Sequence, residues 1–169
     1  MTNVEEKTPW NPSKKATARV KDALPAPTKC PHCGGQVGIK KNSVVYNGRT
    51  YGEWPWVYMC LNRGHCDSYV GMHPFTNIPL GTLANPEIRE SRKKVKNIFY
   101  AYLDKADVSR GKGYQQLAAM MDIDKSECHF GWFDVDACDK AEKALNEMMA
   151  GKKPINPDSP FAGLKDLMK

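Results

Sequence analysis

Apolar and polar positions change their spacing along this chain, and the changes divide it into four regions. Residues 1–28 carry four prolines, several basic residues and few periodic apolar positions, which is typical of a flexible basic arm. Short alternating runs follow in residues 29–84, and apolar positions at helical spacing follow in residues 85–150. Residues 151–169 are proline-rich again and predict a flexible tail. The pattern predicts an α+β fold in which a small antiparallel sheet precedes a three-helix region.

The strands expected in residues 29–84 are short and separated by turn residues. Asn47-Gly48 has the sequence of a tight hairpin turn and should join two of them. We expect strands at Val37 and Ile39, Ser43 to Tyr46, Arg49 to Tyr51, Trp56 to Met59 and Asp67 to Gly71. Upstream of the sheet, Ser13 is a suitable cap for a short helix.

Three helices are expected in residues 85–150. Residues 85–87, Asn-Pro-Glu, combine a capping residue, a proline at the first helical position and an acid in the first turn. The apolar side chains that follow form one stripe and leave a basic outer face. Further helices are predicted from Ser109 to Met121 and from near Asp134 to just before Gly151.

Four cysteines in two close pairs are the most specific chemical signal. They are Cys30 and Cys33, then Cys60 and Cys66, with 26 residues between the pairs. Thiolates in this arrangement can converge tetrahedrally on Zn²⁺, so we predict a structural zinc ribbon in residues 29–84 with these four ligands. The glycines at positions 34, 35 and 64 should let backbone amides turn toward the sulfurs.

Alternatives for the cysteines stay open at this point. They can be buried free thiols or a redox pair, although no thioredoxin-like order of strand and helix surrounds them. His32 and His65 lie beside ligands, and either could replace one of them. The sequence in particular leaves open whether His65 competes with Cys66.

The charge of the chain is uneven and favours an anionic partner. The net charge is +6, but residues 1–103 hold 15 Lys and Arg against 7 Asp and Glu, whereas residues 104–150 hold 6 against 10. Nucleic acid is the first candidate for such a partner, and a solvated lysine face without a partner is the alternative. The cations expected to contact phosphates are Lys40, Lys41, Arg49, Arg89, Arg92, Lys93 and Lys96.

Aromatic residues alternate with the cations of the ribbon. Proteins that bind single-stranded nucleic acid stack bases on such rings, at about 1–3 kcal/mol per base. The rings concerned are Tyr46, Tyr51, Trp54, Trp56 and Tyr58. Some of them can instead form the small core of the ribbon, and we expect that role for Tyr58 and one tryptophan.

The other candidate residues indicate structure rather than chemistry. His73 and His129 are expected to hold loops through hydrogen bonds, and Cys138 is expected in the helical core. Cys128, His129 and Cys138 lack a nearby fourth ligand for a second metal site. The sequence shows no nucleophile with a matching base and no phosphate-binding glycine loop, so we expect no enzymatic activity.

The two ends of the chain bear on its location and partners. The sequence has no run of about 18 apolar residues that could span a bilayer, and its start lacks the features of a signal peptide. We therefore expect a cytoplasmic protein without a membrane partner. In the tail, the apolar residues from Phe161 to Met168 can share one helical face and bind a partner protein; a frayed end is the alternative.

Two stretches of the chain together resemble a known family. The most specific is Cys-Asp-Ser-Tyr-Val-Gly-Met-His at residues 66–73, and the second is Glu-Cys-His-Phe-Gly-Trp-Phe-Asp at residues 127–134. Across residues 29–145 the chain resembles zinc-finger-containing proteins of unknown function that are frequent in phages and prophages. The resemblance implies a zinc ribbon similar to those at the C-termini of bacterial topoisomerases, zinc bound by the four cysteines, and no established reaction. The chain differs from the usual pattern in having five residues, rather than about four, inside its second cysteine pair.

These observations lead to a principal hypothesis and two alternatives. The principal hypothesis is a non-enzymatic phage accessory protein of the host cytoplasm that binds DNA or RNA through its zinc ribbon and basic helix. The first alternative is a protein-binding adaptor that modulates host or phage transcription or replication machinery. The second is a structural component of the virion.

Overall fold

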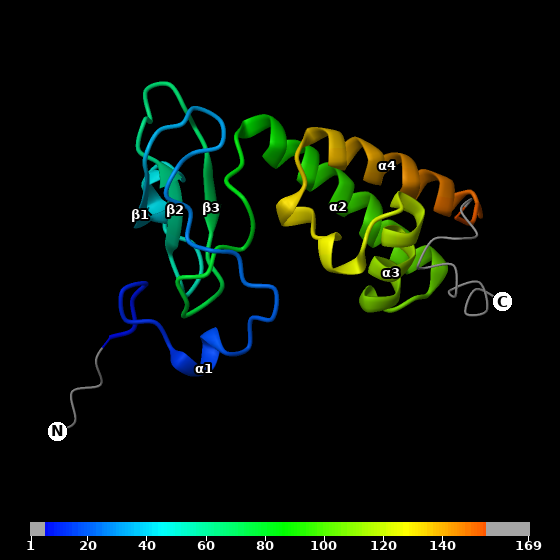
Figure 1. Ribbon diagram of the computed structural model, residues 1–169, viewed down its shortest axis with the longest axis horizontal. Coiled ribbons are helices and arrows are strands. Elements are labelled where there is room, and N and C mark those ends of the chain that lie inside the picture. The colour runs from blue at the N-terminus through cyan, green and yellow to red at the C-terminus, as the bar shows by residue number, and fades with distance from the viewer. Residues whose placement is uncertain (1–5, 155–169) are drawn as a thin grey trace. The chain divides into compact units, whose positions relative to one another are not determined.

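The chain forms two compact units that divide between Pro86 and Glu87 (Figure 1). The computed structural model describes residues 6–154. Its first unit contains a three-stranded antiparallel sheet, and its second unit is helical. The predicted α+β fold is thereby confirmed. None of the helices in residues 6–154 has the length and apolar character needed to cross a membrane.

The sheet of the first unit has the strand order β1-β2-β3. The central strand β2 (Trp56–Cys60) pairs with β1 (Val37–Lys41) on one side and with β3 (Tyr69–Gly71) on the other. In this register Val37 lies opposite Cys60, and Tyr58 lies opposite Val70. Three of the five predicted strands are therefore present.

The other two predicted strands, Ser43 to Tyr46 and Arg49 to Tyr51, are wrong. Residues Asn42–Val44 form a short 3-10 helix, η1, and turns follow up to residue 55. The buried Asn42 side chain donates to the Tyr51 carbonyl at 2.8 Å and accepts from the Tyr51 amide at 3.4 Å. Side-chain bonds of this kind offer the backbone an alternative to a strand ladder. Asn47 and Gly48 do adopt positive φ angles, but they turn within this loop.

The core of the first unit lies on one face of the sheet. The side chains of Tyr58, Cys60 and Val70 point to that face and pack with Leu83. Val37 and Ile39 of β1 pack against this cluster. Tyr58 is buried as expected, and its hydroxyl donates to the Asn77 carbonyl at 2.6 Å. Trp54 and Trp56 are both partly buried against this core. The ring residues of the ribbon thus divide between core and surface.

Part of the segment expected to be a flexible arm is attached to the first unit. Pro9 is fully buried, the Trp10 ring contacts the Trp56 ring, and the Ser13 amide donates to the Phe75 carbonyl at 2.8 Å. Ser13 caps the short helix α1 (Lys14–Thr17), as predicted, and this helix buries no residue. The attachment was missed because Pro9 and Trp10 are isolated apolar positions without periodicity.

The second unit contains the three predicted helices. They are α2 (Pro86–Ala106), α3 (Arg110–Met121) and α4 (Val135–Met149), with the short 3-10 helices η2 (Lys125–Glu127) and η3 (Phe130–Trp132) between the last two. Ser109 caps α3 and Asp134 caps α4 through their side chains. Phe99, Leu117 and Leu145 form the centre of an apolar core with almost no exposed surface. This unit is held together by apolar side chains from α2, α3, η3 and α4.

Candidate metal centre

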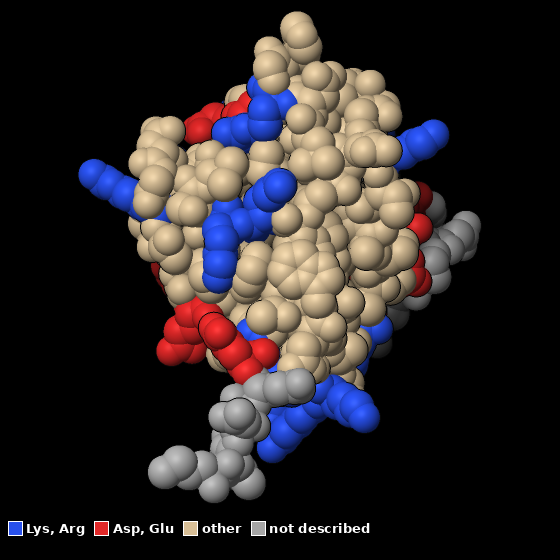
Figure 2. Space-filling view, turned by 90° about the vertical axis from the view of Figure 1, so that its left-hand side faces the viewer, with Lys and Arg blue, Asp and Glu red and all other residues tan. Residues whose placement is uncertain are grey.

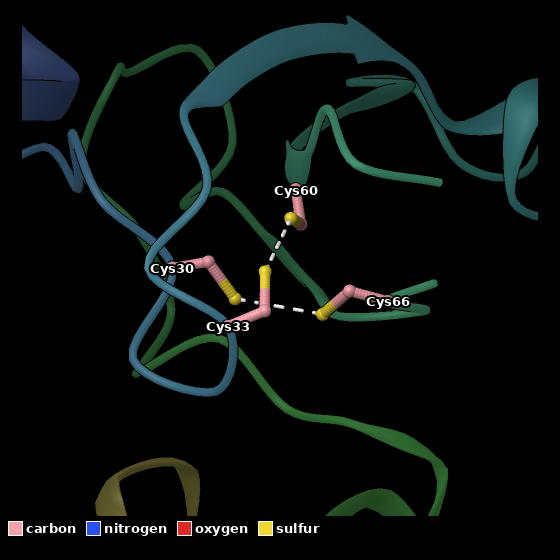
Figure 3. Close-up of side chains that lie close together, drawn as sticks. All are labelled: Cys30, Cys33, Cys60 and Cys66. Atoms are coloured by element: carbon pink, nitrogen blue, oxygen red, sulfur yellow. Dashed lines mark hydrogen bonds between the residues drawn. The ribbon is translucent and has the colours of Figure 1, made fainter. Parts of the chain in front are cut away.

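The side chains of the four predicted ligands point toward a common centre (Figure 3). All four Sγ atoms lie within 4.8 Å of one another. The Sγ atoms of Cys30 and Cys66 are 3.6 Å apart, and those of Cys33 and Cys60 are 3.4 Å apart. Cys30 and Cys33 lie in the turn before β1, Cys60 ends β2, and Cys66 lies in the loop before β3. The antiparallel pairing of β1 and β2 brings the two cysteine pairs together.

The spacing of the sulfurs fits a tetrahedral Zn²⁺ ion. Zn–S bonds of about 2.3 Å in a tetrahedron place sulfurs about 3.8 Å apart, within the range found here. A disulfide would need about 2.05 Å, and all four cysteines are free thiols. Four thiolates are a soft donor set that suits Zn²⁺, and they leave no open coordination position. The residues present therefore form a closed zinc site with a structural role.

The first cysteine turn depends on two glycines. The Gly34 amide donates to the Cys30 carbonyl at 2.9 Å, and Gly34 has a φ of +72° that favours glycine. The Gly35 amide donates to the Cys33 sulfur at 3.4 Å. A Cβ at Gly35 would lie 3.2 Å from the Cys33 sulfur and 3.3 Å from the Cys60 sulfur. Glycine at position 35 lets the backbone approach both thiols.

The second cysteine turn is organised by Asn62. The Asn62 amide hydrogen-bonds to the Cys60 sulfur, and the Asn62 carbonyl accepts from the amides of His65 and Cys66 at 3.0 and 2.9 Å. No atom lies within 4 Å of a Cβ built on Gly64. The amide that turns toward the sulfur thus belongs to Asn62, where Gly64 was expected. Five residues fit between the cysteines because this turn closes on Asn62.

The environment sets the protonation of the thiols. Burial raises the pKa of Cys60 to about 12. The pKa of the exposed Cys33 is lowered to about 7, first by the Gly35 amide and then by the Cys60 thiol. Thiols bind zinc as thiolates, so Cys60 must lose its proton on metal binding.

One further side chain contacts a ligand. Ser68 is completely buried, and its Oγ lies 3.2 Å from the Cys66 sulfur. A hydroxyl in this position orients the ligand and hydrogen-bonds to it. No role was predicted for Ser68, whose signals in the sequence are its place two residues after a ligand and within the run of residues 66–73.

The histidines lie outside the cluster of ligand sulfurs, and the hydrogen-bonding roles expected for His73 and His129 stay predictions. His32 Nε2 lies 3.0 Å from the Leu83 carbonyl, and His65 is exposed. Within the described part of the chain, the cluster of candidate ligand atoms around the site consists of the four cysteine sulfurs. Burial lowers the pKa of His73, and the His129 ring lies 4.2 Å from the Trp132 ring.

The remaining cysteines, Cys128 and Cys138, belong to the core of the helical unit. Burial raises the pKa of Cys128 to about 12 and that of Cys138 to about 11. Both thiols are therefore protonated near neutral pH and serve as apolar core residues.

The seven predicted phosphate-contacting cations differ in exposure. Lys40, Lys41 and Arg49 are exposed in the first unit, and Lys93 and Lys96 are exposed on α2. Figure 2 shows one face of the molecule, on which several basic side chains lie together with groups of acidic side chains.

The two arginines of α2 are less exposed. Arg89 is partly buried. Arg92 Nε donates to the Phe133 carbonyl at 2.7 Å, and burial lowers the Arg92 pKa. The Arg92 guanidinium therefore holds the loop before α4 against α2, a role that helical periodicity does not reveal.

Comparisons with other proteins agree with the site. No curated protein and no solved structure matches the chain. A family model described as a zinc-finger-containing domain, DUF3268, matches residues 26–148, which include all four clustered cysteines, α2, α3 and all but the last residue of α4. The chain belongs to this family of zinc-finger-containing domains.

Proposed function

We propose that this protein binds nucleic acid, DNA or RNA, through cations on both of its units. The observation that carries the proposal is the exposure of Lys40, Lys41 and Arg49 on the zinc-binding unit. Lys40 and Lys41 end strand β1, so the zinc-held sheet fixes their backbone. Exposed cations on a rigid support provide phosphate contacts that do not depend on sequence.

The basic face of α2 adds a second set of phosphate contacts. Val95 and Phe99 are buried in the helical core, whereas Lys93 and Lys96 are exposed. The neighbouring Lys94 pairs with Glu142 at 2.8 Å and is left out of the proposed set. The helix thus turns an apolar stripe inward and a basic surface outward.

The zinc ion has a structural role in this proposal. When bound, it holds the two cysteine turns together and so fixes the sheet that carries the cations. The proposal assigns no catalytic step to the protein. Its resemblance to phage proteins supports an accessory role in the cytoplasm of an infected host cell.

Salt dependence tests the proposal. The zinc-loaded full-length protein is titrated against labelled 20-nucleotide DNA and RNA, single-stranded and duplex, at 50 and 200 mM salt. We expect affinity to fall steeply with salt because phosphate contacts release counterions. Equal affinity at both salt concentrations, or no binding at either, contradicts the proposal.

Charge variants locate the contacts. The triple variant Lys40→Gln, Lys41→Gln and Arg49→Gln should weaken binding and lower the salt slope by about one per phosphate contact removed. The matched control replaces Lys125, Lys140 and Lys143 by Gln, which removes the same charge from exposed positions of the second unit. Equal losses in both variants would show that net charge alone drives the binding.

A protein-binding adaptor is the second candidate function. It is favoured by three aliphatic side chains of the first unit that remain roughly half exposed, Val44, Leu61 and Leu80. Leu61 and Leu80 lie against Gly38 and Gly71, on the face of the sheet opposite the zinc site. The apolar segment from Phe161 to Met168 lies outside the described residues. A protein that stays bound after nuclease treatment, and is lost when residues 151–169 are deleted, would favour this function.

A further inference from the structure

The most exposed large apolar side chain in the described residues is Trp10, at 67% exposure. Its ring meets the Trp56 ring edge to face, with centroids 5.2 Å apart and an interplanar angle of 89°. The Lys41 ammonium lies 3.8 Å from the centroid of the same Trp56 ring. The Trp10 indole is thus largely exposed to solvent, and a lysine ammonium lies over the Trp56 ring that it contacts.

The backbone around Trp10 is held in place. Pro9 is fully buried, and the Asn11 amide donates to the Thr8 carbonyl at 2.9 Å. Two residues further on, the Ser13 amide donates to the Phe75 carbonyl at 2.8 Å. Ordering this segment costs conformational entropy, and most of the Trp10 surface remains in water. The segment therefore presents the ring at a fixed place on the zinc-binding unit.

A second exposed ring, that of Phe75, lies against Trp54. Phe75 is 39% exposed and has a φ of +61°, in the left-handed region that is unfavourable for aromatic residues. Its ring lies 5.3 Å from the Trp54 ring, and Trp54 Nε1 donates to the Thr76 carbonyl at 2.9 Å. Trp54 and Trp56 flank Pro55, so the two tryptophans that support the exposed rings are separated by one residue.

The segments around Trp10 and Trp56 are mainly basic, whereas residues 70–80 around Phe75 carry no charged Lys, Arg, Asp or Glu. Residues 7–15 contain three lysines and no acid, and residues 40 and 41 are both lysine. The acids closest in sequence are Glu6 and Glu53. Exposed rings among lysines are the combination that stacks bases while cations contact the phosphates.

We propose that Trp10 and Phe75 are base-stacking residues, so that the nucleic acid bound by this protein is single-stranded. The inference rests on the proposed function and adds the class of substrate and two contact residues to it. Bases in a duplex are already stacked on one another and cannot cover a protein ring, whereas unpaired bases can. The lysines in the segments around Trp10 and Trp56 favour a nucleic acid over a protein as the occupant.

A leucine and a phenylalanine variant of Trp10 test the inference. Trp10→Leu keeps an apolar side chain against Trp56 but removes the aromatic face, whereas Trp10→Phe keeps a ring. The probes are a labelled 20-nucleotide oligothymidine and a labelled 20-base-pair duplex, titrated against the zinc-loaded full-length protein by fluorescence anisotropy. The control is Tyr100→Leu, which removes from the second unit a ring of 43% exposure, close to the 39% of Phe75. Zinc content and the circular dichroism spectrum are measured for every variant.

We expect the wild-type protein to bind oligothymidine more tightly than the duplex. Trp10→Leu should weaken oligothymidine binding by about five- to 150-fold, the range that corresponds to one stacked base. Trp10→Phe should retain most of the affinity, and the duplex affinity should change little in any variant. Phe75→Leu should cause a loss of the same kind.

The outcomes separate this inference from the proposed function. If the protein binds neither probe under low salt, both are overturned. If it binds both probes equally and Trp10→Leu and Phe75→Leu bind like wild type, nucleic-acid binding stands and the stacking role is wrong. If these variants instead lose a protein captured after nuclease treatment while oligothymidine affinity is unchanged, the rings belong to a protein interface and the inference is overturned.

Discussion

The two units of this protein are stabilised in different ways. The first unit has a small core around Tyr58, Val70 and Leu83, and three of its four clustered thiols are buried in or beside that core. The second has a larger core in which Phe99, Leu117 and Leu145 are almost fully buried. A small sheet with little apolar area needs a metal, whereas three helices with interlocking apolar faces do not. One chain thus draws its stability from metal coordination in the first unit and from apolar packing in the second.

Removal of zinc should have the largest effect and should act on the first unit alone. Zinc binding contributes about 10–16 kcal/mol of apparent free energy in sites of this kind. We expect a strong chelator, or the variant Cys60→Ser, to abolish amide-exchange protection in residues 37–71 while protection in α2, α3 and α4 persists. Cys128→Ala is the control, because it alters a buried thiol of the helical core and should leave the zinc content unchanged. If the sheet kept its amide-exchange protection without zinc, the first unit would not depend on the metal for its stability.

A cavity in the helical core should have the opposite selectivity. Leu145 is completely buried, so Leu145→Ala should destabilise the second unit by about 2–5 kcal/mol. Thermal unfolding followed by helical circular dichroism measures this loss, and zinc content measures the first unit. A loss of zinc in this variant would show that the two units are not stabilised separately.

A methyl group at the contact of α2 and α3 should disturb the second unit more mildly. A Cβ on Gly113 would collide with the Leu103 side chain and lie 3.1 Å from the Phe99 ring. Gly113→Ala should therefore cost about 1–3 kcal/mol in the free energy of unfolding, measured by denaturant titration. Gly111→Ala is the matched control, because no atom lies within 4 Å of its Cβ and alanine favours the helix. Equal stability of the two variants would mean that the helices separate easily at this point.

A methyl group beside the ligand sulfurs should weaken zinc binding in the first unit. Gly35→Ala places a Cβ about 3 Å from two ligand sulfurs and should weaken zinc binding on the order of tenfold. Gly64→Ala should leave zinc affinity nearly unchanged, because no atom lies within 4 Å of its Cβ. Competition with a chromogenic chelator measures both affinities. Identical zinc affinities of the two variants would show that the close approach of the Gly35 backbone to the sulfurs does not affect zinc binding.

Features with a local cause could be predicted from the sequence. Ser109 and Asp134 cap two helices, and the starts of these helices were predicted to within a residue. The clustering of Cys30, Cys33 and their two partners followed from the spacing of the pairs, because an antiparallel sheet joins segments that lie close in sequence.

Features with a non-local cause could not be predicted. Asn42 closes a loop on Tyr51, where alternation suggested strands. Arg92 donates to a carbonyl 41 residues away. Helical periodicity placed Arg92 on the polar face of α2 but could not show this bond. Trp10 contacts Trp56, which lies far from it in the sequence. A single aromatic residue in a proline-rich segment carries no periodic signal that could predict this contact.

The order in which the ligands are synthesised follows from their positions. All four zinc ligands lie within residues 30–66, and α2, α3 and α4 are all translated after Cys66. Domains generally fold as units from the N-terminus while the ribosome is still working. The coordination site can therefore close on the nascent chain before α4 exists, and the helices then assemble without any thiol of the site left to oxidise or misbond. The order of the cysteines and the helices along the chain thus lets zinc coordination precede the packing of the helices.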